Sequence, residues 1–346
     1  MRQHYRLHGL HLRTVSNHPA VQRLLHHTLR CKGAKQIDKD TPLPPDSIDA
    51  TLDFSVDRAS PPPPVDAHHI TTGEHFGIDA WRTSGQMILH YEDTTITLNS
   101  ETGVAEGAIA TDLLGTSPKS RDQSILYYLT AFSLSILLRA RGWYPLHAAA
   151  LVYDGRGILL PARSGQGKST IALSLLRNGW TALSDDTVLL RFEEDQITTY
   201  SFRRDFRVGR DTAACFPEFD GPNWPTALSD PSKWRVDIDR IYPGQSASSC
   251  TSHLLVVPEI VDAPTSHVEP IGPKPALEQL LNEGGFFFAP DSNVANRHLA
   301  VLRHLTNQTR TYRLHAGRDI LENPRTPHTL LTPLFREPTP PDGECA

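Results

Sequence analysis

The feature that most constrains the fold of this chain is a short glycine-bearing run near its middle, Ala162-Arg163-Ser164-Gly165-Gln166-Gly167-Lys168-Ser169-Thr170. The apolar residues 157–160 before it predict a strand, and the apolar residues 171–176 after it predict a helix. A strand, loop and helix in this order direct several backbone N–H groups and the positive end of the helix toward one point. The run therefore predicts an anion-binding loop at the edge of an α/β sheet.

The run also matches the phosphate-binding pattern G-x-x-x-x-G-K-[ST] at every fixed position except the first, where the chain has Ala162. Because alanine is strained at positive φ, we expect Ala162 to keep φ below zero. In such a loop Lys168 reaches the β- and γ-phosphates, and the Ser169 hydroxyl ligates Mg²⁺. The alternative is a glycine turn with an incidental lysine. The residues expected to contact phosphate are Ser164, Gly165, Gln166, Gly167, Lys168, Ser169 and Thr170.

Length and composition limit the class of protein. With 346 residues, 38% of them apolar, the chain is long enough for two domains. A formal charge of -5 with both signs mixed along the chain argues against nucleic acid and anionic membranes as partners.

The four cysteines form no C-x-x-C pair, which fits a reducing cytosol. We find no signal peptide and no run near the roughly 18 apolar residues of a membrane span, and expect a cytoplasmic protein. Homo-oligomerisation is left open.

The first part of the chain predicts a β-rich accessory domain over residues 1–120. Residues 5–15 alternate like one strand, and Ser16-Asn17 is a candidate cap for an amphipathic helix that follows. Proline clusters within 40–66 predict an extended loop. Residues 86–98 are typical of a β-hairpin.

A second domain is predicted over residues 121–335, followed by a disordered tail at 336–346. It opens with a long apolar helix at 122–141. Asp154-Gly155 between two apolar runs predicts a hairpin whose second strand enters the glycine-bearing loop. Further strands are predicted at 187–192, 196–202, 252–257 and 310–314, and further helices at 274–283 and 293–306.

Two adjacent carboxylates, Asp185 and Asp186, follow the strand that returns from the loop helix. A right-handed strand–helix–strand crossover brings the carboxyl ends of its two strands to the same edge of a sheet. We therefore expect both aspartates beside the phosphates, where one can hold Mg²⁺ and the other can accept the proton of an attacking hydroxyl. The alternative is a solvated, structural Asp-Asp turn.

Three motifs in register resemble the C-terminal kinase domain of HPr kinase/phosphorylase: His147-Ala148-Ala149, the loop 164–169, and Asp185-Asp186. The resemblance covers roughly residues 147–200. It implies an α/β fold with a P-loop kinase core of the HPr kinase / phosphoenolpyruvate carboxykinase type. It also implies that Asp185 is the base toward a serine hydroxyl and that His147 lies near the reacting phosphoryl group. More narrowly, the chain is similar to lasso peptide tailoring kinases, which phosphorylate a serine near the C-terminus of the precursor peptide.

The chain also departs from that family. No Leu-Glu-x-Arg-Gly-type segment supplies the metal-binding glutamate, and Asp205 and Asp211 are the nearest substitutes, although each is expected to be structural. Whether the reverse, phosphorylase reaction occurs is therefore left open. Arg163, Lys233 and Arg235 are candidate cations for the transferred phosphoryl group; for Lys233 and Arg235 a plain surface turn is an equal alternative.

The sequence as a whole predicts a kinase that uses ATP and Mg²⁺ to phosphorylate a serine-type hydroxyl of a peptide or protein. The predicted catalytic residues are Asp185, His147 and Lys168, and the predicted metal ligands are Ser169 and Asp186. One alternative is a small-molecule kinase or a relative of ATP-dependent phosphoenolpyruvate carboxykinase. Another is a non-catalytic nucleotide-sensing module whose N-terminal region binds a peptide. The aspartate pair argues against pure sensing, because sensing needs no base.

Overall fold

The computed structural model divides into two compact units. It describes residues 1–38, 47–56, 64, 67–71, 77–83, 85–114, 121–202, 205–220, 224–227, 230–284, 289 and 291–336. The first unit consists of Met1–Pro145, Pro225–Trp234 and Gly285–His298, and the second of Leu146–Trp224, Arg235–Gly284 and Leu299–Ala346. The boundary predicted at residue 120 differs from this division. The predicted tail from residue 337 onward lies outside the described residues.

The first unit is built on a nine-stranded sheet in the order β3-β1-β2-β4-β9-β8-β7-β6-β5. Its strands are β1 (Arg2–Leu7), β2 (Leu10–Val15), β3 (Lys35–Gln36), β4 (Ala50–Ser55), β5 (His68–Thr71), β6 (Asp79–Arg82), β7 (Gln86–Tyr91), β8 (Thr94–Asn99) and β9 (Val104–Ala108). β4 runs parallel to both of its neighbours, and the other pairs are antiparallel. The predicted hairpin at 86–98 is confirmed as β7–β8.

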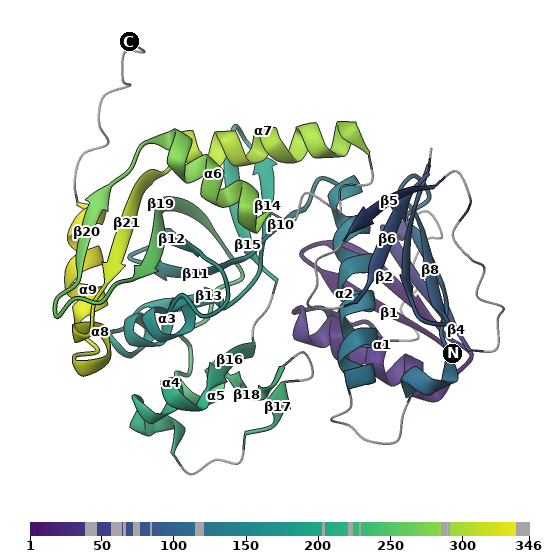
Figure 1. The fold of residues 1–346 in the computed structure, drawn as a ribbon, viewed down its shortest axis with the longest axis horizontal. Helices are drawn as coiled ribbons and strands as arrows, with labels where there is room; N and C mark the ends of the chain where they lie inside the picture. Colours follow the sequence, from purple (N-terminus) through teal and green to yellow (C-terminus); the bar gives the residue numbers. More distant parts are fainter. Residues whose placement is uncertain are drawn as a thin grey trace. The chain divides into compact units, whose positions relative to one another are not determined.

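Two helices pack on this sheet and on each other (Figure 1). They are α1 (Pro19–Cys31) and α2 (Arg121–Ala140), and both contact β4. The long apolar helix predicted at 122–141 is therefore confirmed, and its packing explains why it belongs to the first unit. This unit also contains the short helix η2 (Thr111–Leu114), the strand β17 (Thr226–Ala227) and the start of β18 (Asp230–Asp237).

Three predictions for this unit are wrong in detail. Residues 5–15 form two antiparallel strands, because His8 and Gly9 both have positive φ (47° and 86°) and make a turn between them. The extended loop predicted over 40–66 contains β4, a buried strand between the proline clusters. The helix begins after His18, whose side chain accepts the N–H of Ala20, and not after Ser16-Asn17.

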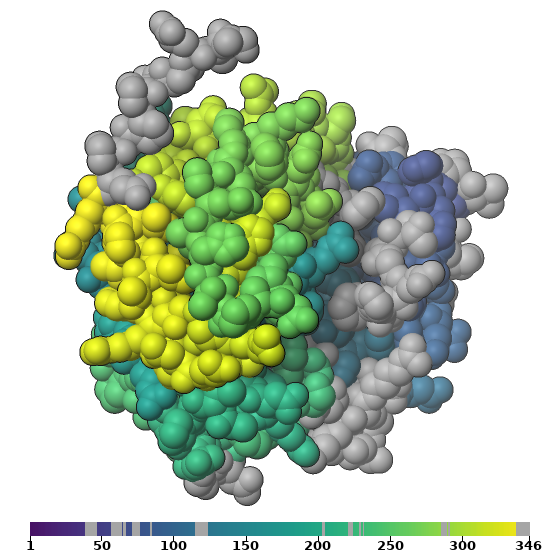
Figure 2. Space-filling model, turned by 60° about the vertical axis from the view of Figure 1, so that its left-hand side comes forward, coloured from purple at the N-terminus to yellow at the C-terminus, as the bar shows by residue number. Residues whose placement is uncertain are grey.

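The second unit has a mixed sheet in the order β10-β14-β15-β19-β12-β11-β13, with β21 pairing with β19 and β20. The strands of this sheet are β10 (Tyr144–Leu146), which spans the boundary, β11 (Ala148–Tyr153), β12 (Arg156–Pro161), β13 (Thr181–Ser184), β14 (Val188–Glu193), β15 (Gln196–Ser201), β19 (Ser249–Ile260), β20 (His267–Pro270) and β21 (Arg310–Ala316). The strand β16 (Asp205–Gly209) lies outside this sheet. The strands predicted at 187–192, 196–202, 252–257 and 310–314 are confirmed. Figure 2 shows β20 (green) beside β21 and the C-terminal helices (yellow) on one face.

Helices pack against this sheet in positions that matter for the loop. The helix elements are α3 (Lys168–Arg177), α4 (Arg210–Ala214), η3 (Pro217–Phe219), α5 (Ile238–Ile241), α6 (Pro273–Glu283), α7 (Ser292–Gln308, which begins in the first unit), α8 (Asp319–Glu322), α9 (Thr326–Leu331) and η5 (Pro333–Phe335). α3 contacts β11 and β13, whereas α6 contacts β12 and β19. The helices predicted at 274–283 and 293–306 are thus confirmed. Within the described residues, none of the helices has the length and apolar character needed to cross a bilayer.

The strand that leads into the loop is the second strand of a hairpin, as predicted. β11 and β12 pair antiparallel from Ala148↔Pro161 to Tyr153↔Arg156, and the two turn residues have positive φ, 48° at Asp154 and 73° at Gly155. β13 also pairs antiparallel with β11. Because β11 lies antiparallel between them, β12 and β13 run in the same direction. Their carboxyl ends, and the residues that follow them, therefore share one edge of the sheet.

Candidate functional site

The glycine-bearing run forms a loop between β12 and α3. Gly165 and Gly167 have φ of 88° and 83°, a conformation that residues with a Cβ rarely adopt. Ala162 is not among the described residues with positive φ, which agrees with our expectation that its φ stays below zero. The side-chain oxygen of Gln166 accepts the N–H of Arg163 at 3.1 Å and bridges the loop. By helix geometry, the first N–H groups of α3 cannot bond to carbonyl groups of the helix itself, which makes them potential donors to an anion.

Lys168 begins α3, and its side chain folds back under the loop. The residue is only 7% exposed. Its ammonium group donates hydrogen bonds to the carbonyl oxygens of Ala162 and Arg163, the latter at 2.9 Å, and lies 3.1 Å from Nε2 of His147. A buried ammonium needs such acceptors, because losing water without replacement is costly. The structure thus holds the lysine at the centre of the loop by contacts that a phosphate oxygen could replace.

His147 lies just before β11 and links the lysine to Asp186. An ammonium group can only donate, so a neutral His147 accepts at Nε2 and carries its proton on Nδ1. Nδ1 lies 3.5 Å from Oδ1 of Asp186, so the Nδ1 proton faces a carboxylate oxygen. The side chains of His147 and Asp186 are 31% and 23% exposed. Lys168, His147 and Asp186, which we call the loop triad, therefore form a row with a charged group at each end, and the row reaches the surface.

The two predicted aspartates lie in different environments. Asp185 is 2% exposed, and its Oδ2 accepts the backbone N–H of Arg207 on β16 at 2.8 Å. Asp186 is half-buried, and its Oδ2 accepts a hydrogen bond from Thr187 at 3.1 Å. The structure therefore brings Asp186 into contact with His147 and sets Asp185 deeper, against β16. Because catalytic contacts often form only in the complex, this geometry does not remove Asp185 as a candidate base.

Glu283, at the end of α6, is a residue at this site that the sequence analysis missed. Its backbone oxygen accepts the N–H of His147 at 3.1 Å, and its side chain is buried. Burial raises the pKa of its carboxyl group, and the positive charges of Lys168 and Arg163 oppose that rise. The helix that carries Glu283 was predicted, but no motif connects position 283 with the loop. Only the packing of α6 on β12 and β19 brings it there.

The donor set for a metal ion at the loop is small. Ser169 and Thr170, in the first turn of α3, are half-buried, and the hydroxyl of Thr170 lies 3.3 Å from that of Thr212. Among the described residues, no three His, Cys, Asp or Glu side chains are grouped as metal ligands. Mg²⁺ is commonly bound through one or two protein oxygens, with phosphate and water oxygens completing its shell. One hydroxyl from Ser169 and one carboxylate from Asp186 fit that chemistry.

The remaining sequence candidates are engaged elsewhere. Asp205 pairs with Arg235 at 3.4 Å, so both are neutralised by an ion pair of the second unit. Lys233 pairs with Asp230 at 3.5 Å in the first unit. Asp211 is exposed at the start of α4. Neither ion pair connects Asp205, Arg235 or Lys233 to the loop triad.

Two comparisons with known proteins find similarity to parts of this chain. The family model described as ScmC, a SynChlorMet cassette protein, matches residues 117–202, which include the loop triad and Asp185. Among solved structures, an HPr(Ser) kinase/phosphatase from Coxiella burnetii is 18% identical, with a TM-score of 0.26; the match covers 37% of this chain and 72% of that one. No curated protein matches. The helices and sheets of the chain itself make it a mixed α/β protein.

Proposed function

We propose that this protein is a kinase that transfers the γ-phosphoryl group of ATP to a serine-type hydroxyl of a peptide or protein. The observation that carries the proposal is the loop triad, in which a buried lysine, a histidine and a carboxylate meet at the start of a helix. A loop of this kind binds the phosphates through backbone N–H groups and a lysine ammonium. In narrower form, the acceptor is the precursor of a lasso peptide, in line with the family that the sequence motifs resemble.

In this reaction the chain stabilises charge on the phosphates, accepts the serine proton and holds Mg²⁺. The serine oxygen attacks the γ-phosphorus, the bond from that phosphorus to the bridging β–γ oxygen breaks, and ADP leaves. Lys168 stabilises the negative charge on the phosphate oxygens, and His147 lies beside that charge. Asp185 takes the proton of the serine hydroxyl, and the backbone N–H of Arg207 orients its carboxylate. Mg²⁺, held by Ser169 and Asp186, supplies further positive charge when it is bound.

The test is phosphoryl transfer from labelled ATP to peptides with a serine near their C-terminus, and to the same peptides with that serine replaced by alanine. A positioned base contributes about 10²- to 10⁴-fold, so Asp185→Asn should lose most transfer but keep ATP affinity. Label that appears on the serine-containing peptides and not on their alanine versions supports the proposal. ATP that binds and is never consumed with any acceptor would contradict it and would favour a nucleotide-sensing module.

A matched pair of variants assigns the base. Asp185→Asn and Asp186→Asn each remove one charge from neighbouring positions, one buried and one half-buried. If Asp186 serves the metal, Asp186→Asn raises the Mg²⁺ concentration needed for half-maximal rate, and excess Mg²⁺ partly restores activity. If Mg²⁺ restores nothing to Asp186→Asn while Asp185→Asn stays active, the roles of the two aspartates are reversed.

A further inference from the structure

The strand β19 extends past the loop and forms a wall beside it. β19 runs parallel to β12 and pairs with it up to Leu255, opposite Leu159. It then continues to Ile260, which pairs with Ala316 of β21. A Cβ atom built on Gly167 would lie 3.9 Å from both Cγ1 and Cδ1 of Ile260. The last residue of β19 is therefore in contact range of the loop.

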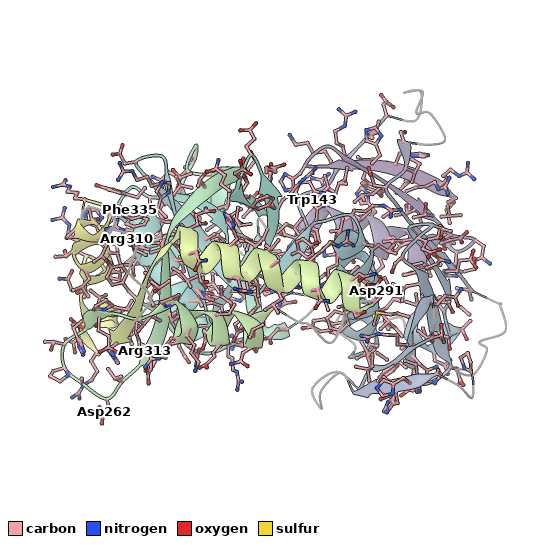
Figure 3. The ribbon with its side chains drawn as sticks, turned by 90° about the horizontal axis from the view of Figure 1, so that it is seen from above. Trp143, Asp262, Asp291, Arg310, Arg313 and Phe335 are labelled. Carbon is pink, nitrogen blue, oxygen red and sulfur yellow. The ribbon has the colours of Figure 1, made fainter. Side chains whose placement is uncertain are left out.

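Ile260 presents an apolar side chain to solvent at this place. It is 61% exposed, the most exposed of the large hydrophobic side chains that the structure describes. The turn that follows Ile260, where Figure 3 labels Asp262, is bound to the end of β21 by hydrogen bonds. Val261 donates its N–H to Ala316 at 3.0 Å, and Arg318 donates its N–H to Ala263 at 2.9 Å. Single exposed apolar residues are common, but this one is held rigidly next to a candidate ligand loop.

The order of the strands sets the direction of a nucleotide in the loop. His147 precedes β11 and Asp186 follows β13, so the reacting end of the site lies on that side of β12. β19 lies on the opposite side of β12, and neighbouring strands are about 4.8 Å apart. A triphosphate whose γ-phosphate meets Lys168 and His147 therefore has room to extend its nucleoside end toward β19.

We propose that Ile260 is the surface against which the purine base of the bound nucleotide packs. The inference rests on the proposed function, because it takes the loop as the triphosphate site. Packing an aliphatic side chain against a purine ring removes apolar surface of both groups from water. The rigid turn after Ile260 already fixes the backbone of this residue. Packing the base against its side chain therefore costs less conformational entropy.

The experiment compares two ligands and two variants by calorimetry in the presence of Mg²⁺. The ligands are ATP and inorganic tripolyphosphate, which has the phosphates but no base. The variants are Ile260→Ala and the control Leu321→Ala, which truncates another exposed residue (55%) of the same unit. Ile260→Ala should weaken ATP about three- to tenfold and leave tripolyphosphate unchanged. Leu321→Ala should change neither affinity.

The outcomes separate this inference from the proposed function. Unchanged ATP affinity in Ile260→Ala, or an equal loss for ATP and tripolyphosphate, overturns the base contact while leaving the triphosphate loop in place. If the unmodified protein binds neither ligand, the proposed function itself fails and the base contact falls with it.

Discussion

The two units of the molecule use buried polar side chains in different ways. In the first unit, neutral groups tie α1 to the sheet: Gln22 donates to Gln3 at 2.9 Å and to Thr14 at 2.8 Å, and the Tyr5 hydroxyl lies 3.0 Å from Nδ1 of His26. In the second unit, the polar contacts around the glycine-bearing loop belong to the loop triad, which ends at partly exposed groups. A neutral, closed network holds elements together. A charged, open row can exchange its partners with a ligand, because a phosphate oxygen can replace each acceptor of the lysine.

The largest expected effect on ATP binding comes from removing the lysine of the loop triad. Hydrogen bonds to charged groups contribute about 1.5–3 kcal/mol, so Lys168→Ala should weaken ATP binding about 10- to 150-fold, as measured by calorimetry. The control is Lys32→Ala, because Lys32 is the other buried lysine of the described residues, at 4% exposed, and lies in the first unit. Lys32→Ala should change the melting temperature but not the ATP affinity. Equal ATP affinity in both variants would show that the loop does not bind the triphosphate.

Lowering the pH should destabilise the first unit through His298 and stabilise the second unit through Glu283. Burial is the main reason that the pKa of His298, in the first unit, is lowered to about 3, and the positive charge of Arg139 adds to the effect. Between its usual value near 6.5 and 3, the unfolded state binds the proton and the folded state does not. Stability is therefore present above pH 6.5 and is lost as the pH falls, by up to about 1.4 kcal/mol per pH unit.

Glu283, in the second unit, responds in the opposite direction. Its folded pKa is raised above 4.5 by burial, so the folded state binds the proton more readily and gains stability as the pH falls through that raised value. Denaturant titrations at a series of pH values between 7 and 4, with exchange of backbone amides resolved by unit, measure both effects. His298→Gln should flatten the slope of the first unit. A first unit whose stability does not change over that range would contradict the burial of a neutral His298.

A third variant tests whether the neutral network only holds the structure. Gln22→Ala removes two hydrogen bonds, one of them to the fully buried hydroxyl of Thr14, which costs about 1–3 kcal/mol of unfolding free energy. Phosphoryl transfer at a temperature well below the melting point should be unchanged. A loss of transfer without a loss of stability would mean that the first unit takes part in the reaction.

The sequence predicted well what depends on local pattern. The hairpin at Asp154-Gly155 has a turn with a strong local signature, and the helix after Lys168 follows from the loop and its apolar period. β4 was missed because the surrounding prolines dominated the pattern, although the strand itself alternates. Glu283 could not be found at all, because its place next to His147 depends on how α6 packs on the sheet. The depth of Asp185 likewise depends on β16, which the sequence did not predict.

The smallest expected effect comes from restoring the glycine that the phosphate-binding pattern asks for. Ala162 is fully buried and has no positive φ, so it has no strain for Ala162→Gly to relieve. The substitution adds freedom to the unfolded chain and should lower the unfolding free energy by about 0.4–1 kcal/mol, with ATP affinity changed less than twofold. Thermal melting and calorimetry on the same preparation measure both quantities. A marked gain in ATP affinity would show instead that the alanine methyl group holds the loop away from its binding geometry, and that the contacts of Lys168 with the loop carbonyls close the site in the free protein.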